Sequence, residues 1–497
     1  MNHSLGRGSC LALGIALAWV GAAFAAQPPN IVFILADDLD AASAATMDQV
    51  RTLVTNQGTS FRHHYVNVSL CCPSRVSTLR GQFAHNTTIF GNDAPDGGFE
   101  GTYAKGLESS TIATWLQDAG YRTVLFGKYL NGYPNTAPSI TYIPPGWTEW
   151  YSANGGSPYS AFNYKLNENG QTVSYGNADS DYLTDVIAAK ATDFIRRSAD
   201  QHPEQPFFAY ISTYAPHLPA TPAPRYAQAL PGITAPRTLS FNEPDVSDKP
   251  TWLRDAPLLT EAEITTIDQQ YRSRRQSLLA VDDLVKSVID TLEATGQLAN
   301  TYVFVTSDNG FHHGEHRLTS GKLTAFEEDV HIPLSVRGPG VPAGATVDAL
   351  TANVDYAATF AEIAGATVPS WVDGRSVVPF LRGQNPQPWR RAMLLARGEH
   401  GGTARAQDGL LEPPDPFDTL AVSIPPFTGL RTADDYTYVA YASGEYELYQ
   451  NSRDPKQLRN QYDAANENQK AHLAAWLDAL VNASGEALRE AELRPPK

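Results

Sequence analysis

Short runs of apolar residues alternate with longer amphipathic stretches between residues 30 and 310. The short runs are nearly continuous in apolar residues, which is typical of strands buried on both faces of a sheet. They cover residues 31–36, 123–126, 207–212 and 302–306. This alternation predicts an α/β fold in which helices cover both faces of a large parallel or mixed sheet.

Two of the longer stretches carry the period of a helix. Apolar residues in 276–292 recur at alternating steps of three and four, as at Leu278, Val281 and Val285, and residues 182–195 repeat this pattern. Helices that pack on a sheet have this spacing because about 3.6 residues make one turn. We therefore expect two helices that lie on the sheet.

Two segments interrupt the alternation. Asn169-Gly170 divides residues 164–175 into two halves, and this dipeptide favours a tight β-turn, so a hairpin is predicted. Residues 216–250 are rich in proline and polar residues, which predicts a long loop over the catalytic face.

The composition changes at about residue 386. Tyrosines in 432–447 recur as in a β-meander, and residues 467–481 have the pattern of a terminal helix. We expect a catalytic domain over residues 28–385 and a smaller α+β subdomain over residues 386–497.

The N-terminus has the pattern of a secretory signal peptide. Arg7 precedes an apolar run over residues 11–20, and Ala23-Phe24-Ala25 offers small residues for cleavage. A membrane anchor is the alternative, but the run is shorter than the roughly 20 residues that a spanning helix needs. We expect a signal peptide over residues 1–25, export to the periplasm or the exterior, and no membrane span after cleavage.

The charge balance limits the partners. The chain has 37 Lys and Arg against 53 Asp and Glu, a net charge of -16, and its basic residues form no long run. Long-range attraction of nucleic acid or of a long polyanion is therefore excluded. An anionic substrate has to be held by a local pocket.

After signal cleavage the chain keeps two cysteines, the adjacent Cys71 and Cys72. A disulfide between neighbours is strained because their Cα atoms lie only about 3.8 Å apart. Pro73 suits the first position of a helix and Gly81 its end, so the cysteines should lie at a helix N-terminus. An anion is stabilised there and a thiolate has a lowered pKa. A buried structural thiol explains Cys71 alone equally well.

Polar pairs follow two of the predicted strands. Asp37 and Asp38 follow residues 31–36, and Asp308 and Asn309 follow residues 302–306. Ligands of open α/β sheets gather at the carboxyl ends of strands, and oxygen ligands suit Ca²⁺ or Mg²⁺. Each pair alone is also explained as a helix cap or a turn.

The sequence Cys71-Cys72-Pro73-Ser74-Arg75, followed by Leu79-Arg80-Gly81, resembles the signature of the sulfatase family, in which the first cysteine is oxidised to formylglycine. Further similar segments are residues 30–38, 127–131, 215–217, 307–316, 321–322 and 373–376. The resemblance is strongest to the N-acetylglucosamine-6-sulfatase and arylsulfatase groups.

This resemblance implies an alkaline phosphatase-like fold and one Ca²⁺ ion, with Mg²⁺ possible. The implied metal ligands are Asp37, Asp38, Asp308, Asn309 and the modified Cys71. It also implies a formylglycine-generating enzyme as maturation partner. Three carboxylates exceed the charge of a divalent ion, so cations are needed before a sulfate can enter. The matching positions are Arg75, Lys128, His217 and Lys322.

The resemblance also implies the roles of these residues. The hydrated aldehyde attacks sulfur, Lys128 and Lys322 stabilise the sulfuryl oxygens, and His217, with Lys322, protonates the departing alcohol. Arg75 fixes the modified residue, and the second hydroxyl of the hydrate then expels sulfate.

One position departs from the family pattern. Many arylsulfatases have a histidine where this chain has Leu130, and that histidine is assigned to the expulsion of sulfate. Possible replacements are His85, His312, His313 and His316, for which a structural role is the favoured interpretation. The base of this step is therefore unassigned.

The predicted function is hydrolysis of a sulfate ester of an aryl alcohol or a sugar. One alternative is a phosphodiesterase or phosphonate monoester hydrolase, because related folds exchange sulfuryl for phosphoryl transfer. A second, non-enzymatic alternative is a sulfated-glycan binding protein that has lost catalysis, although binding alone needs no modifiable cysteine.

Overall fold

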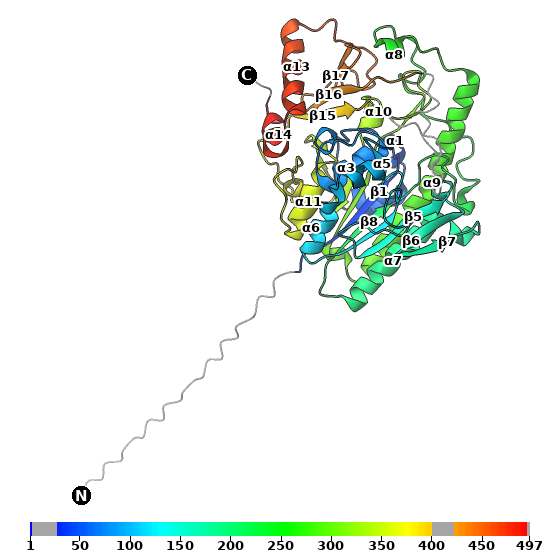
Figure 1. The fold of residues 1–497 in the computed structure, drawn as a ribbon, viewed down its shortest axis with the longest axis vertical. Coiled ribbons are helices and arrows are strands. Elements are labelled where there is room, and N and C mark those ends of the chain that lie inside the picture. Colours follow the sequence, from blue (N-terminus) through cyan, green and yellow to red (C-terminus); the bar gives the residue numbers. More distant parts are fainter. Residues whose placement is uncertain (2–26, 400–421, 495–497) are drawn as a thin grey trace.

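The computed structural model describes Met1, residues 27–399 and residues 422–494 (Figure 1). Apart from Met1, the predicted signal peptide lies outside the described residues. None of the described helices is long and apolar enough to cross a membrane.

A ten-stranded mixed sheet forms the centre of the fold. Its strands lie in the order β13 (Ala345–Val347), β2 (Thr59–Phe61), β12 (Leu334–Arg337), β9 (Thr301–Ser307), β1 (Asn30–Ala36), β8 (Phe207–Ser212), β4 (Arg122–Gly127), β5 (Glu149–Gly156), β6 (Tyr164–Glu168) and β7 (Gln171–Ser174). Strands β9, β1, β8, β4 and β5 run parallel to one another. The predicted fold class, the four predicted strands and the hairpin β6–β7 are confirmed.

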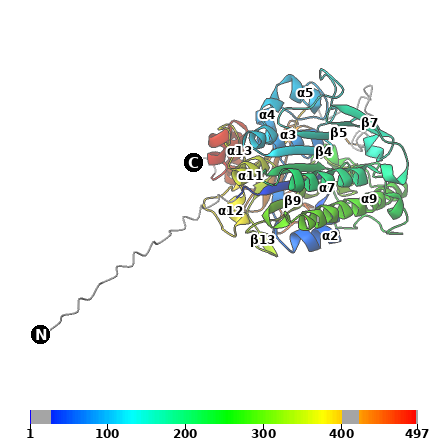
Figure 2. The ribbon, with the colours of Figure 1, turned by 90° about the horizontal axis from the view of Figure 1, so that it is seen from below.

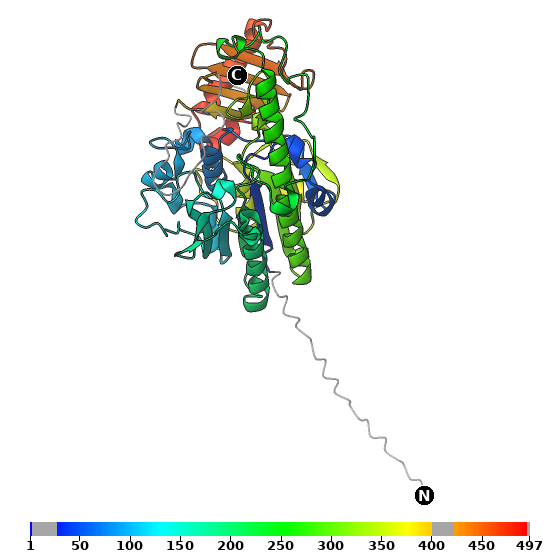
Figure 3. The same ribbon diagram turned by 90° about the vertical axis from the view of Figure 1, so that its right-hand side faces the viewer.

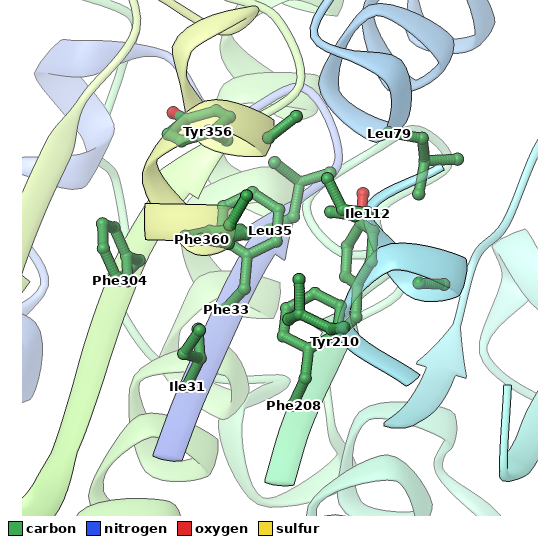
Figure 4. Close-up of a cluster of buried hydrophobic side chains, with 14 of the residues drawn as sticks. Ile31, Phe33, Leu35, Leu79, Ile112, Phe208, Tyr210, Phe304, Tyr356 and Phe360 are labelled. Carbon is green, nitrogen blue, oxygen red and sulfur yellow. The ribbon is translucent and has the colours of Figure 1, made fainter. Parts of the chain in front are cut away.

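Helices cover both faces of this sheet (Figure 2). Ile31, Phe33 and Leu35 pack on one face against α3 (Cys71–Arg80), α6 (Ile112–Asp118) and α11 (Asp355–Ala364), as Figure 4 shows. Val32 and Ile34 pack on the other face against α7 (Leu183–Gln201) and α9 (Glu261–Ala294). Side chains alternate between faces along a strand, so β1 is apolar on both sides and buried throughout.

The two long helices were predicted, but α9 begins well before residue 276. Thr260 caps it, because its hydroxyl accepts from the Glu263 amide at 3.3 Å while the Glu263 carboxylate accepts from the Thr260 amide at 2.7 Å. Such a capping box marks a helix N-terminus. Ile264, Ile267 and Tyr271 continue the apolar spacing toward this cap, so the helical pattern begins before the range used for the sequence prediction.

The other described helices and strand pairs are short. The helices are α1 (Ala41–Ala44), α2 (Asp48–Val50), α4 (Ala84–Thr87), α5 (Gly98–Ala104), α8 (Thr251–Arg254), α10 (Glu327–Val330) and α12 (Val378–Leu381). The pairs are β3 (His64–Tyr65) with β14 (Thr351–Ala352) and β10 (His312–His313) with β11 (Ser320–Gly321). The long predicted loop contains one 3₁₀ turn, Pro224–Tyr226, among residues 216–250.

A small antiparallel sheet follows. It contains β15 (Ala392–Arg397), β16 (Phe427–Thr432), β17 (Tyr436–Tyr441) and β18 (Tyr446–Gln450), with α13 (Glu467–Val481) and α14 (Gly485–Ala491). The predicted meander and terminal helix are present, and α14 was not predicted. The domain boundary at residue 386 stays a prediction.

A buried ion cluster joins the C-terminal residues to α11. Arg390 is 1 % exposed, and its guanidinium donates to Asp355 at 2.6 and 2.8 Å and to Glu492 at 2.8 Å. Its neighbour Arg391 pairs with Asp434 on the surface, where both side chains are half-exposed or more.

These two adjacent arginines predict opposite effects on stability. Replacement R390M leaves the buried Asp355 carboxylate without its guanidinium partner and Glu492 with Arg375 alone, so we expect the free energy of unfolding to fall by about 3–5 kcal/mol. R391M removes only an exposed pair and should cost at most about 1 kcal/mol. Chemical denaturation of both variants measures this, and equal losses would show that the buried cluster contributes no more than a surface pair.

Candidate active site

The predicted site residues meet at one edge of the central sheet. Asp37 and Asp38 follow β1, and Asp308 and Asn309 follow the neighbouring parallel strand β9. Lys128 follows β4, where Gly127 has φ +90° and an added Cβ would lie 1.9 Å from the Ser212 carbonyl oxygen. Parallel strands end at the same edge, so distant segments of the sequence reach one site.

Cys71 is the first residue of α3 and is fully buried. Its Sγ lies 3.3 Å from Asp37 Oδ1, 3.7 Å from Asp38 Oδ1 and 3.0 Å from Lys322 Nζ. Pro73 is the third helical residue, not the first as predicted, while Gly81 ends the helix with φ 66° as expected. The helix N-terminus therefore contains both cysteines and directs Cys71 at the carboxylates.

The predicted lowering of the Cys71 pKa is wrong. Burial raises the pKa of the Cys71 thiol well above its usual value, and the negative charge of Asp37 raises it further. Lys128 and Lys322 lower it by less. The helix N-terminus favours a thiolate, but desolvation disfavours any charged form and outweighs that effect. Cys71 is therefore a neutral thiol before any modification.

Three buried carboxylates lie close together in the site. Asp37, Asp38 and Asp308 each offer an oxygen, and these oxygens lie within 4.8 Å of one another. The Asp38 amide donates to Asp308 Oδ1 at 2.9 Å, and Asn309 Nδ2 donates to Asp38 Oδ1 at 2.8 Å. Asp38 has φ 64°, a left-handed conformation that is uncommon outside glycine.

The oxygen atoms of this cluster fit a hard cation. Asp38 Oδ2 and Asn309 Oδ1 are buried and have no hydrogen-bond donor among the described residues. A buried acceptor without a partner costs about 1–3 kcal/mol, which a cation would recover. Carboxylate and amide oxygens are the ligands that Ca²⁺ and Mg²⁺ take.

Three cations offset the three carboxylates. Lys128 Nζ lies 2.6 Å from Asp37 Oδ2, and Lys322 Nζ lies 2.6 Å from Asp38 Oδ1. Arg75 Nε lies 2.8 Å from Asp308 Oδ2. Burial alone raises the pKa of Asp37, but Lys128 and the other cations outweigh it and hold that pKa well below its usual range. The individual side chains of the centre are therefore ionised, while their charges sum to nearly zero.

Arg75 also connects the site to two strands. It donates through Nη1 to the Lys128 carbonyl at 3.1 Å and to the Ser212 hydroxyl at 2.7 Å. These contacts orient Asp308 and the segment that carries Lys128. The role of Arg75 in fixing the modified Cys71 stays a prediction.

His217 lies at the edge of the same cluster. Its Nδ1 donates to the Leu218 carbonyl at 2.6 Å, since a carbonyl can only accept. Its Nε2 lies 3.7 Å from Asp38 Oδ2, and its ring packs at 4.7 Å against Tyr159. Nε2 is therefore the nitrogen that can exchange a proton within the site.

The alternative histidines lie in other contacts. His85 donates a hydrogen bond to the Ala483 carbonyl. The ring nitrogens of the other three contact carboxylates: His312 contacts Asp329, His313 contacts Asp40 and His316 contacts Glu243. Leu130 is 4 % exposed and packs in the core beside Tyr129 and Tyr133. The structural interpretation of these histidines is favoured, and the base that expels sulfate stays unassigned.

Several residues that shape the site had no recognisable signal in the sequence. The Lys128 ammonium lies 5.1 Å from the Tyr159 ring, which also contacts His217. The Cys72 amide donates to Asn92 Oδ1 at 3.0 Å. Arg274 contacts the carbonyl of Asp38 from helix α9. Tyr159, Asn92 and Arg274 lie outside the segments that carry the family resemblance, so those segments could not identify them.

Comparison with known proteins identifies the class. The sulfatase family model matches residues 29–366, so the chain belongs to the sulfatase family, whose members hydrolyse sulfate esters. Human N-acetylglucosamine-6-sulfatase is 38 % identical over 402 residues, 80 % of this chain and 71 % of the relative. The arylsulfatase of Volvox carteri is 31 % identical over 520 residues, 94 % of this chain and 76 % of the relative.

Solved structures share the fold. A protein solved with its substrate D-glucosamine-2-N,6-O-disulfate has a TM-score of 0.74 and 23 % identity over 91 % of this chain and 97 % of its own. The phosphonate monoester hydrolase of Silicibacter pomeroyi has a TM-score of 0.65 and 22 % identity over 90 % and 93 % of the two chains.

The burial and the protonation of the Cys71 thiol predict how it reacts before it is modified. In folded, unmodified protein lacking residues 1–25, Cys71 and Cys72 are buried, and a raised pKa keeps Cys71 as the thiol. Thiolates are the species that alkylate, so iodoacetamide at about pH 8 should modify neither residue until denaturant is added. Intact-protein mass spectrometry counts the alkyl groups. Rapid alkylation of Cys71 in the folded state would contradict this environment.

Proposed function

We propose that this protein is an exported sulfatase that removes the sulfate of sugar 6-sulfates or aryl sulfates through formylglycine at position 71. The position of Cys71 is the observation that carries the proposal. Its Sγ marks where an oxygen of the modified residue would lie, within 3.7 Å of two carboxylates and one lysine ammonium. A structural thiol has no need of such a polar environment.

One divalent cation, Ca²⁺ or Mg²⁺, would be held by Asp37, Asp38, Asp308, Asn309 and the modified Cys71. When bound, it supplies positive charge that activates an oxygen nucleophile and polarises the sulfuryl group. The two buried oxygen atoms without donors, on Asp38 and Asn309, support this ligand set.

The charge count favours an anionic ester. The charges of three carboxylates and three basic side chains cancel, so a divalent ion leaves two positive charges in the site. A sulfate ester contributes one negative charge and an ionised hydroxyl of the hydrated aldehyde another. Protonated His217, the proposed acid, adds a further positive charge beside Asp38, so the site is suited to an anionic ester, and unbalanced buried charge is expensive.

The side chains of the site have separate proposed roles in the reaction. Lys128 and Lys322 are the ammonium groups available to the sulfuryl oxygens, where charge is redistributed in the transition state. His217 Nε2 is the proton donor for the departing alcohol, and the Leu218 carbonyl fixes its ring. Arg75 holds Asp308 and keeps the carboxylate set in place.

A sugar carrying a 6-sulfate is the proposed substrate class. Human N-acetylglucosamine-6-sulfatase, at 38 % identity, supports it. With a net charge of -16 the protein does not attract long polyanions, which favours small esters or the end of a chain. A phosphodiester also carries one negative charge, so the charge count alone does not separate it, but membership of the sulfatase family favours sulfate.

Maturation has to precede folding in this proposal. Cys71 has 0 % exposure, so a formylglycine-generating enzyme cannot reach it in the folded chain. The signal peptide predicted for residues 1–25 would then direct the protein to the periplasm or the exterior.

The adjacent cysteines allow a matched test of the nucleophile. C71A should reduce hydrolysis of an aryl sulfate to background, whereas C72A removes a neighbouring buried thiol and should keep most of the kcat. Activity is measured with the same aryl group presented as sulfate and as phosphate diester, and sulfate should be preferred. Full activity in C71A, or a large preference for the diester, would refute the proposal.

The role of His217 predicts a dependence on the leaving group. H217A should lower kcat for a sugar sulfate by about 10²–10⁴-fold, because an alkoxide leaves poorly without a proton. An aryl sulfate with an acidic phenol should lose much less. K128A serves as control and should slow both substrates similarly, since it acts on the sulfuryl group. Equal losses for both substrates in H217A would exclude proton donation.

A further inference from the structure

We infer that Arg274 is a positioning residue that fixes three active-site loops relative to one another; this inference rests on the proposed function. Arg274 lies within α9, which runs along the molecule beside α7 (Figure 3). It is 1 % exposed. Arginine is rarely buried this completely without a partner, so its contacts should reveal its role.

The contacts of Arg274 go to the loops after β1, β8 and β9. Nη2 donates to the Asp38 carbonyl after β1, and Nη1 donates to the Pro216 carbonyl after β8 at 3.1 Å. The guanidinium carbon lies 4.0 Å from the centre of the Phe311 ring, after β9. One planar group therefore touches each loop that carries a proposed metal ligand or the proposed acid.

The contact with Asp38 acts on a conformation that needs support. Asp38 has φ 64°, and for a residue with a side chain such backbone costs about 1–3 kcal/mol unless its surroundings fix it. Its amide is held by Asp308 Oδ1 at 2.9 Å and its carbonyl by Arg274. With both backbone groups held, the Asp38 carboxylate points into the ligand set.

The contact with Pro216 acts on His217, the next residue. The His217 ring is fixed through its own Nδ1, and Arg274 fixes the preceding carbonyl. The geometry of the metal ligands and that of the proton donor are therefore coupled through one side chain. Neither interaction requires Arg274 to touch the substrate.

The carboxylate of Asp40 keeps the guanidinium in place. Asp40 Oδ2 lies 3.6 Å from Arg274 Nη2, while Asp40 Oδ1 accepts from the Ser43 amide at 2.8 Å. His313 Nε2 approaches the same carboxylate at 3.5 Å. Asp40 is thus fixed by α1 and by β10, and it balances the charge that Arg274 brings into the interior.

The shape of the guanidinium matters as well as its charge. Two parallel N–H groups reach two carbonyls at once, which a lysine ammonium on a flexible stem cannot reproduce. R274K therefore keeps the charge and loses the simultaneous hold on Asp38 and Pro216. Residues that orient metal ligands typically contribute 10–100-fold to metal affinity or activity.

The test compares R274K with R390K, a conservative change of a second buried arginine, whose guanidinium donates to Asp355 and Glu492. Calcium affinity is measured on metal-free protein by titration against a chelating indicator, independently of catalysis. We expect R274K to bind Ca²⁺ about 10–100-fold more weakly. Its kcat for a sugar sulfate should also fall more than its kcat for an activated aryl sulfate. R390K should lower only the melting temperature.

The outcomes separate the two claims. If the wild-type protein neither binds a divalent ion nor hydrolyses sulfate esters, the proposed function fails. If the wild-type protein does both, and R274K matches it in calcium affinity and in the ratio of sugar to aryl rates, Arg274 is only structural and the inference is overturned. If R274K does not fold, R274A is measured with added guanidinium ion instead. Recovery of calcium affinity supports the positioning role of Arg274, and no recovery in folded R274A opposes it.

Discussion

Burial of several charges at one point is the constraint on which the site depends. Asp37, Asp38 and Asp308 are removed from water, and their mutual repulsion would exclude any anionic substrate. Lys128, Lys322 and Arg75 restore the balance at 2.6–2.8 Å. In the proposed function, this centre binds one divalent cation and an anionic ester, and these charges connect the fold to sulfate-ester hydrolysis.

The scaffold explains how such a centre can be assembled. Four parallel strands end at one edge of the sheet, and the segment after each of them contributes residues to the site. The strands are apolar on both faces and packed between helices, so their ends are rigid supports. Helix α3 brings Cys71 to the same edge, and α9 brings Arg274 into contact with the loops after β1, β8 and β9. Polar groups are therefore confined to the strand ends, while the interior of the sheet stays apolar.

Much of this arrangement could be predicted from the sequence, because continuous apolar runs mark buried strands and polar pairs follow them directly. The pKa of Cys71 was predicted with the wrong sign, since a motif reveals the helix N-terminus but not the desolvation around it. Arg274 escaped prediction because a single arginine in a helix gives no signal of burial. Contacts between distant loops depend on tertiary packing, which local sequence patterns do not encode.

The central claim is that Cys71, and not Cys72, becomes the reactive group of a metal-assisted sulfatase. Mass spectrometry of the proteolytic peptide that spans both cysteines, taken from active protein, tests this most directly. We expect a peptide lighter than the dithiol form, with the aldehyde located at position 71 by fragmentation and a free thiol at position 72. Fully active protein in which Cys71 remains a thiol would contradict it.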